Sequence, residues 1–141
     1  MGKIKKPFAF VVDWGLFPDE TLVVVGKISP EGVMHLAKKY PLKKSFLAEL
    51  DTKLSTLPLY APFFMTFEKS GSSMMHLPDY EDTWGFWETL IHELHHGVQM
   101  VLGENRCMEK EIEALAYSQE NLFRKIRRNL QGIDPYKKVT L

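Results

Sequence analysis

The sequence has one cysteine, Cys107, in 141 residues. A single thiol cannot form an intramolecular disulfide, and it cannot build a zinc site from several thiolates. We therefore expect a cytoplasmic protein, in a reducing compartment, whose stability comes from a packed core. Cys107 is a conceivable metal ligand, but an isolated thiol is more often a small buried hydrophobic residue.

Long apolar runs and an excess of one charge are also missing. No stretch approaches the roughly 18 apolar residues that span a bilayer, and Asp13 interrupts the N-terminal apolar run too early for a secretory signal. The 18 Lys and Arg balance the 18 Asp and Glu, which argues against an overall charge for binding nucleic acid or anionic membranes. Hydrophobic residues make up 45%, so length and composition fit one globular domain over residues 1–141.

The apolar pattern predicts two β-hairpins and four helices. Ser29 and Pro30 have the residue types of a helix N-cap and first turn, Pro41 ends that helix, and Gly103 is typical of the residue after a helix. The expected strands are 8–14, 21–27, 63–68 and 73–77, and the expected helices are 30–40, 44–56, 83–102 and 108–130. The order ββααββαα predicts an α+β domain, a small and mostly antiparallel sheet packed on helices.

Residues 91–97 read IHELHHG and contain three histidines and one glutamate within five positions. On the expected helix His92 and His96 lie about 40° apart, so two imidazoles one turn apart face the same side and can bind one zinc ion. Glu93 sits about a quarter turn away, where it can act as general base on a metal-bound water. A solvated polar helix face is the alternative interpretation. The expected core residues are on the opposite side of the helix: Trp87, Leu90, Ile91, Leu94, Val98, Val101 and Leu102.

A catalytic zinc site needs a third ligand, and the last expected helix offers glutamates. If this helix packs antiparallel beside the first, Glu113 can face the histidine pair and complete a His₂Glu site. Glu109 and Glu120, one turn before and two turns after Glu113, are alternatives. The apolar stripe of this helix is Ile112, Leu115, Leu122, Phe123 and Ile126, which leaves Glu113, Ala116, Tyr117 and Glu120 on a different face.

The segment HELHHGVQ followed by EALAY resembles the gluzincin branch of the zincin metallopeptidases, including small phage-type zincin-like proteins. The resemblance is specific over about residues 88–123 and only architectural before that. It implies that His92, His96 and Glu113 bind one Zn²⁺ ion and that Glu93 is the general base. The gap between His96 and Glu113 is short, and no part of these 141 residues matches the longer C-terminal subdomain of large gluzincins. The substrate-binding residues of those enzymes therefore have no assigned counterparts here.

Four further features each have two interpretations. Tyr117 could hydrogen-bond a developing oxyanion or simply pack between two helices. His76 lies in the strand before the histidine helix, where the resemblance to zincins implies an edge strand able to pair with an extended peptide. The alternative is that a lone histidine in a strand is an ordinary surface or core residue. His95 points away from the pair, toward solvent or neighbouring side chains. The basic run 124–128 fits the negative end of a helix dipole better than a nucleic-acid contact.

These patterns predict a zinc-dependent hydrolase that cleaves peptide bonds. Its partner would be a peptide or protein substrate, with neither nucleic acid nor membrane involved. The alternative is a zincin-like binding or regulatory module with structural zinc or none. A nucleic-acid accessory protein that uses the basic last helix is a third, less favoured hypothesis.

Overall fold

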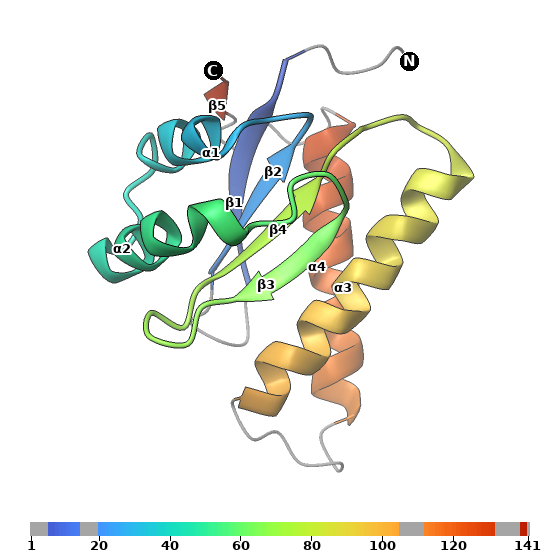
Figure 1. Cartoon of the computed structure of the whole chain (residues 1–141). Coiled ribbons are helices and arrows are strands. Elements are labelled where there is room, and N and C mark those ends of the chain that lie inside the picture. The colour runs from blue at the N-terminus through green and yellow to red at the C-terminus, as the bar shows by residue number, and fades with distance from the viewer. Residues whose placement is uncertain (1–5, 15–19, 105–111, 132–138, 141) are drawn as a thin grey trace.

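The computed structural model describes residues 6–14, 20–104, 112–131 and 139–140, and within these ranges the side chains of residues 102–104, 112–115 and 139–140 lie outside the description (Figure 1). The elements are β1 (Phe8–Asp13), β2 (Glu20–Val25), α1 (Pro30–Ala37), α2 (Lys44–Lys53), the 3₁₀ turn η1 (Leu54–Thr56), β3 (Phe63–Thr66), β4 (Ser73–Leu77), α3 (Trp84–Glu104), α4 (Ile112–Leu130) and β5 (Val139–Thr140). The predicted α+β class and element order are confirmed, with β5 as an addition. No helix in the described part of the chain is long and apolar enough to cross a membrane.

The strands form one mixed sheet in the order β3-β4-β2-β1-β5. Strands β1 and β2 pair antiparallel, as do β3 and β4, so both predicted hairpins are confirmed. The hairpins join through the parallel pair β2 and β4, and the short β5 adds to β1. The sheet is therefore mostly antiparallel, and β3 is its edge strand on the side of the second hairpin.

Both faces of the sheet are covered by helices (Figure 1). Because side chains alternate along a strand, Leu22 and Val24 of β2 enter one core, and Val23 and Val25 enter the other. Helices α1 and α2 complete the first core, and α3 and α4 complete the second. This two-sided burial explains why β2 is a continuous apolar run rather than an alternating one.

The C-terminal ends of three helices, α1, α2 and α3, differ from the expected ones. Helix α2 ends at Lys53 rather than at residue 56, and the 3₁₀ turn η1 follows it. The Ser29 hydroxyl accepts a hydrogen bond from the Gly32 amide at 3.1 Å, which confirms the N-cap of α1. Helix α1 ends at Ala37 rather than near residue 40. The Tyr40 hydroxyl beyond this end donates to the Ala9 carbonyl at 2.8 Å and so connects the segment to β1. Helix α3 continues through Gly103 to Glu104, so the prediction that Gly103 follows the helix is wrong.

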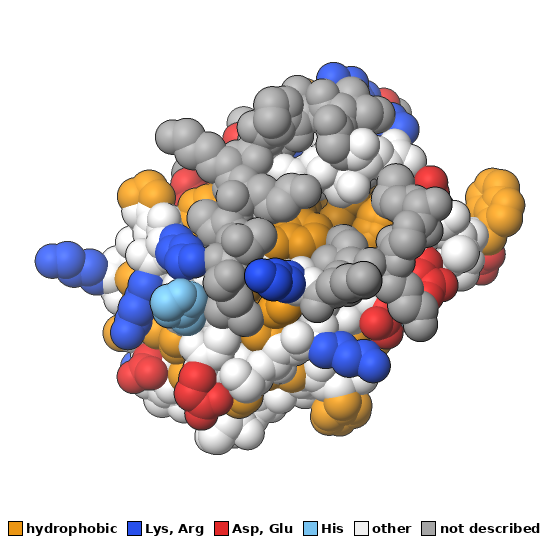
Figure 2. Space-filling model, turned by 90° about the horizontal axis from the view of Figure 1, so that it is seen from above, with side chains coloured by type: hydrophobic (Ala, Val, Ile, Leu, Met, Phe, Trp, Pro, Cys, Tyr) orange, Lys and Arg blue, Asp and Glu red, His pale blue; other side chains and the backbone are white. Residues whose placement is uncertain are grey.

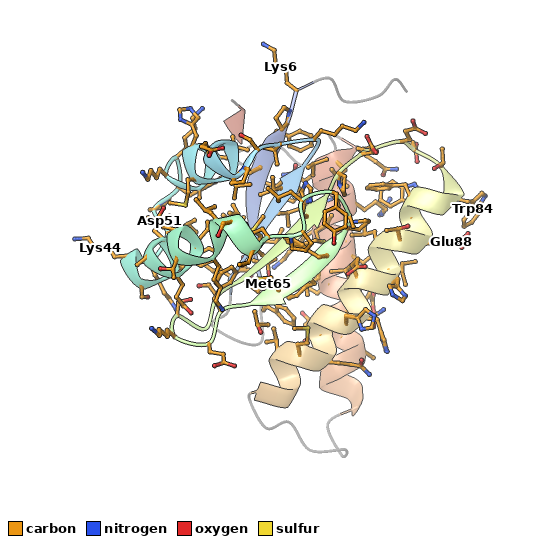
Figure 3. All side chains as sticks on the ribbon, in the orientation of Figure 1. Lys6, Lys44, Asp51, Met65, Trp84 and Glu88 are labelled. Carbon is orange, nitrogen blue, oxygen red and sulfur yellow. The ribbon has the colours of Figure 1, made fainter. Side chains whose placement is uncertain are left out.

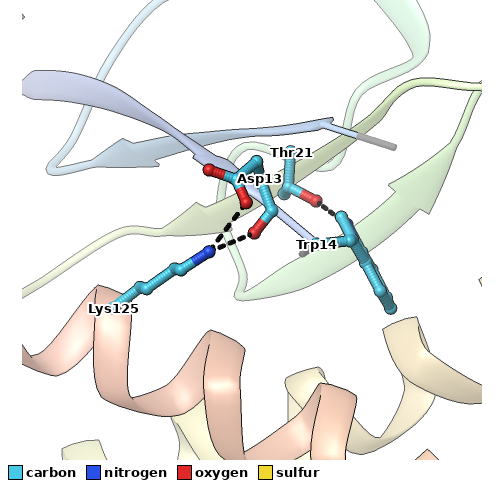
Figure 4. A network of polar contacts seen from close by, with 4 residues as sticks. All are labelled: Asp13, Trp14, Thr21 and Lys125. Atoms are coloured by element: carbon cyan, nitrogen blue, oxygen red, sulfur yellow. Dashed lines mark hydrogen bonds and ion pairs between the residues drawn. The ribbon is translucent and has the colours of Figure 1, made fainter. Parts of the chain in front are cut away.

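Polar contacts fix α4 against the sheet (Figure 4). The Lys125 ammonium donates to the Asp13 carbonyl at 3.0 Å and to its carboxylate at 2.8 Å. Next to it, the Trp14 indole donates to the Thr21 hydroxyl at 2.9 Å. The Asp13 carboxylate is largely exposed, so the ion pair contributes at most about 1 kcal/mol. Its main consequence is to orient α4 along β1. The predicted end of α4 at Leu130 is confirmed, and residues 108–111 of its expected start lie outside the described residues.

Candidate metal centre

Helix α3 uses one side for the core, largely as its periodicity predicts. Most of the expected core residues whose side chains are described are fully or partly buried: Trp87, Leu90, Leu94, Val98 and Val101. Ile91 is the exception, because it is 45% exposed at the seam between α3 and α4, and its assignment to the core is wrong. The side of α3 that carries His92 and His96 is left open to solvent.

The two histidine rings converge. The Nε2 atoms of His92 and His96 lie 3.1 Å apart, and the ring planes stand at 85° with centroids separated by 4.6 Å. Two nitrogens held about 2.0–2.1 Å from one tetrahedral zinc ion are roughly 3.3 Å from each other. The pair therefore has nearly the spacing that two ligands of one metal ion require. Without metal, the same spacing lets one neutral ring donate a hydrogen bond to the other.

Glu93 lies between the histidine face and the sheet. It is half-buried, a quarter turn around α3 from His92, in the direction of Gly97. Gly97 packs directly on the Phe64 ring of β3. Glu93 therefore belongs to the region where the histidine face of α3 approaches the edge strand.

Gly97 allows an unusually close contact between α3 and β3. A Cβ atom at this position would lie 2.5 Å from two carbons of the Phe64 ring and 2.7 Å from a third. Only glycine leaves room for the ring, so Gly97 determines how near the histidine face comes to β3. The spacing of HELHHG does not reveal this role, because the partner ring comes from another segment of the chain.

Replacing Gly97 by alanine is expected to destabilise the fold by about 1–3 kcal/mol, since the Phe64 ring must move or distort its surroundings. Urea unfolding measures the change. Gly85→Ala is the matched control, because a Cβ there has nothing within 4 Å and alanine favours a helix. Equal stabilities of the two variants would contradict the close-contact interpretation. In a Phe64→Leu background the penalty of Gly97→Ala should shrink, because the two positions are in contact.

Helix α4 runs antiparallel to α3, as expected (Figure 1). The His95 ring nitrogen Nδ1 lies 3.4 Å from the Gln119 side-chain oxygen, and the Trp87 and Phe123 rings pack with centroids 6.1 Å apart. His95 thus faces α4, which agrees with its exclusion from the metal pair. Along the helix axes, these contacts place the histidine pair at about the same height as the turn of α4 around Gln119 and Glu120.

The position of α4 along α3 affects which glutamate of α4 could be the third metal ligand. Glu120 lines a groove of about 360 Å³ between the helices together with Ile91, and its carboxylate accepts a hydrogen bond from Arg124 at 2.8 Å. Glu113 lies in the first turn of α4, about 10 Å from Glu120 along the helix axis, toward the connection between α3 and α4. Its side chain lies outside the described residues, as do Glu109 and Cys107. Among the side chains that the structure describes, no three His, Cys, Asp or Glu form a metal-binding group.

Tyr117 is 51% exposed on α4. This exposure does not fit the interpretation that it only packs between two helices. Its ring is on the part of α4 that also carries the exposed residues Ala116 and Glu120. The proposed contact with an oxyanion stays a prediction.

His76 is a core residue. It is fully buried, its Nε2 lies 3.0 Å from the Gly26 carbonyl oxygen, and its ring packs against Phe63. Strand β4, which carries it, lies between β3 and β2, so the expectation that this strand is the edge is wrong. Among the described strands the outer position beside α3 belongs to β3, because the hairpin places the earlier strand outside.

Burial should make stability depend on His76 at mildly acidic pH. Desolvation lowers the pKa of His76 below its usual value of 6.5. Below pH 6.5 the unfolded chain binds this proton before the folded protein does, so folding free energy is lost as pH falls, by at most about 1.4 kcal/mol per pH unit. Urea unfolding from pH 7 to 5 should show wild type losing more stability than His76→Gln. Equal losses of stability in wild type and His76→Gln over this pH range would contradict the prediction. The control is His35→Gln, at an exposed position, which should lose as much stability as wild type.

The basic run of α4 is largely engaged within the protein. Arg124 pairs with Glu120, Lys125 with Asp13, and Arg127 donates to the Gln131 side chain at 3.2 Å. On the face shown in Figure 2, basic and acidic side chains are interspersed. These contacts favour a structural role for the run over a nucleic-acid surface.

No protein-family model, curated protein or solved structure matches this chain.

Proposed function

We propose that the chain is a small zinc-dependent hydrolase that cleaves peptide bonds. The observation that carries this proposal is the 3.1 Å separation of the His92 and His96 Nε2 atoms, on an exposed face opposite the core. Neutral imidazole is a favoured zinc ligand, so the donor set fits this metal. A merely solvated helix face does not require two rings to point at a common position.

The third protein ligand in this proposal is a glutamate of α4. Glu113 is favoured by the resemblance of EALAY to the gluzincin pattern. Glu120 is an alternative because its neighbour Gln119 contacts His95, but in the described structure its carboxylate is bonded to Arg124 and forms no metal-binding group with the histidine pair. In both cases two histidines and one carboxylate would leave a fourth position open, which catalytic zinc requires.

Glu93 would be the general base. A zinc ion held by the two histidines and the glutamate would polarise the scissile carbonyl and lower the pKa of a water molecule. The Glu93 carboxylate would accept a proton from the attacking water and deliver it to the nitrogen of the leaving amine. Because Glu93 and the histidines belong to the same 21-residue helix, their relative positions are held by one rigid element.

A peptide substrate fits the position of the edge strand. Among the described strands β3 pairs with β4 alone, so its outer edge is where an extended chain would add to the sheet. The contact between Phe64 and Gly97 keeps this strand against α3. Met65, in the middle of β3, has a half-buried side chain (Figure 3). An added peptide strand would pass close to the histidine face.

The test is cleavage of a broad peptide library by the full chain, before and after removal of metal with a chelator. We expect hydrolysis that is lost on chelation and restored by zinc. Hydrolysis that persists without metal would contradict the proposal. Stoichiometric zinc without cleavage of any peptide would also overturn the enzyme assignment and favour the binding-module alternative.

A further inference from the structure

A cavity of about 440 Å³ opens beside the first turns of α3. Three segments form its wall: the chain that enters β3, the chain that leaves β4, and α3 itself. The residues that line the cavity include Tyr60, Asp79, Glu81, Gly85, Phe86 and Thr89. Its volume lies within the range of pockets that bind small molecules or side chains, about 300–1,000 Å³.

The α3 residues that line the cavity lie on the same side of the helix as the histidine pair. At about 100° per residue, Gly85 and Thr89 lie within about 60° of His92 around the helix. Thr89 is one turn before His92 and Glu93, which corresponds to about 5 Å along the axis. Strand β3 and helix α3 both start at the cavity and run away from it in a similar direction (Figure 1). A chain lying along β3 at the proposed metal centre would therefore place a neighbouring side chain at the cavity.

The charged groups of the cavity wall are acidic. Asp79 and Glu81 line it, and none of the described residues in the wall is Lys, Arg or His. The positive end of the α3 dipole acts in the opposite sense, but it amounts to only about half a unit charge. The full negative charge of the Asp79 carboxylate by itself outweighs this half charge, so the cavity favours a cation.

Aromatic rings contribute in the same direction. Tyr60 is 88% exposed at the cavity, and the Phe86 ring stacks on Tyr80 with centroids 4.9 Å apart. Aromatic faces attract ammonium and guanidinium groups and also pack against their aliphatic stems. The Thr89 hydroxyl is already used, because it donates to the Gly85 carbonyl at 2.9 Å. Carboxylates and rings are therefore the groups that select a ligand.

We propose that this cavity accepts a lysine or arginine side chain of the substrate, so that cleavage occurs next to a basic residue. The proposal rests on the hydrolase function above and names its substrate class. Its evidence is the joint occurrence of a cavity, acidic and aromatic walls, and a position one helical turn from the histidine pair.

The experiment compares two peptides that differ only in lysine or norleucine at the position next to the cleaved bond. We expect wild type to prefer the lysine peptide by about tenfold in kcat/KM, the scale of one charge-assisted contact. In the double variant Asp79→Asn/Glu81→Gln the lysine-to-norleucine ratio should fall to near one. Asp51→Asn, at an exposed position on α2 (Figure 3), should leave the ratio unchanged. Cleavage without a basic preference, or a preference that survives in the double variant, would overturn the proposal.

Binding of the same peptides to the Glu93→Gln protein, measured by calorimetry, separates the two levels of the hypothesis. Tighter binding of the lysine peptide that is lost when Asp79 and Glu81 are also neutralised would support the cavity assignment, whether or not wild type cleaves the peptides. If wild type cleaves neither peptide, only the hydrolase function is overturned. Equal binding of both peptides would overturn the cavity assignment.

Discussion

Glu93→Gln is expected to lower kcat by about 10²–10⁴-fold while zinc binding is retained, because glutamine keeps the shape of the side chain but cannot accept the proton of the attacking water. The half-buried position of Glu93 beside the histidine pair should tolerate the isosteric amide without loss of fold. The measurement combines steady-state hydrolysis of a cleaved library peptide with zinc content and a urea unfolding curve.

Glu88→Gln is the matched control for this variant. Glu88 lies on the same helix and is exposed (Figure 3), so the exchange removes the same charge outside the proposed site. We expect it to retain turnover. A Glu93→Gln protein as active as wild type would contradict the general-base role, and equal losses in both variants would show that the effect is a matter of charge rather than position.

His96→Ala is expected to weaken zinc binding by at least about 100-fold. Even loss of a residue that only orients a ligand costs about 10–100-fold in affinity, and removal of a direct ligand should cost more. The affinity is measured by equilibrium competition with a chromophoric chelator. His95→Ala is the matched control, since its ring lies against Gln119 on α4 rather than with the pair.

The comparison of these adjacent histidines tests the geometry of α3 directly. His92 and His96 share a face and approach to 3.1 Å, whereas His95 lies on the side of the helix seam. If His95→Ala lost as much zinc as His96→Ala, the metal would lie between α3 and α4 rather than on the open face. That outcome would contradict the site as proposed.

Much of the fold follows from local patterns. Runs of β-branched residues predict the hairpin strands, and the Ser29–Pro30 pair predicts the start of α1. Periodicity does not predict which strands pair across the chain. The parallel pairing of β2 with β4 and the addition of β5 to β1 depend on contacts between distant segments. For this reason the sequence pattern does not distinguish β4 from β3 as the edge strand, and β3 occupies that position.

The same distinction applies to the candidate site. Helical spacing alone predicts that His92 and His96 share a face, because both belong to one helix. The position of α4 residues relative to that face depends on how two helices slide along each other, and the sequence of either helix leaves this open. Ile91 and Gly97 show the consequence: the first is exposed at the seam, and the second meets a ring from β3.

The stoichiometry of zinc in the full chain is the most direct measurement of the proposed metal centre. The wild-type protein, supplemented with zinc and then dialysed, should retain one zinc ion per chain, and Glu93→Gln should retain the same amount. Protein that retains no zinc under these conditions would contradict the metal centre and, with it, the hydrolase function.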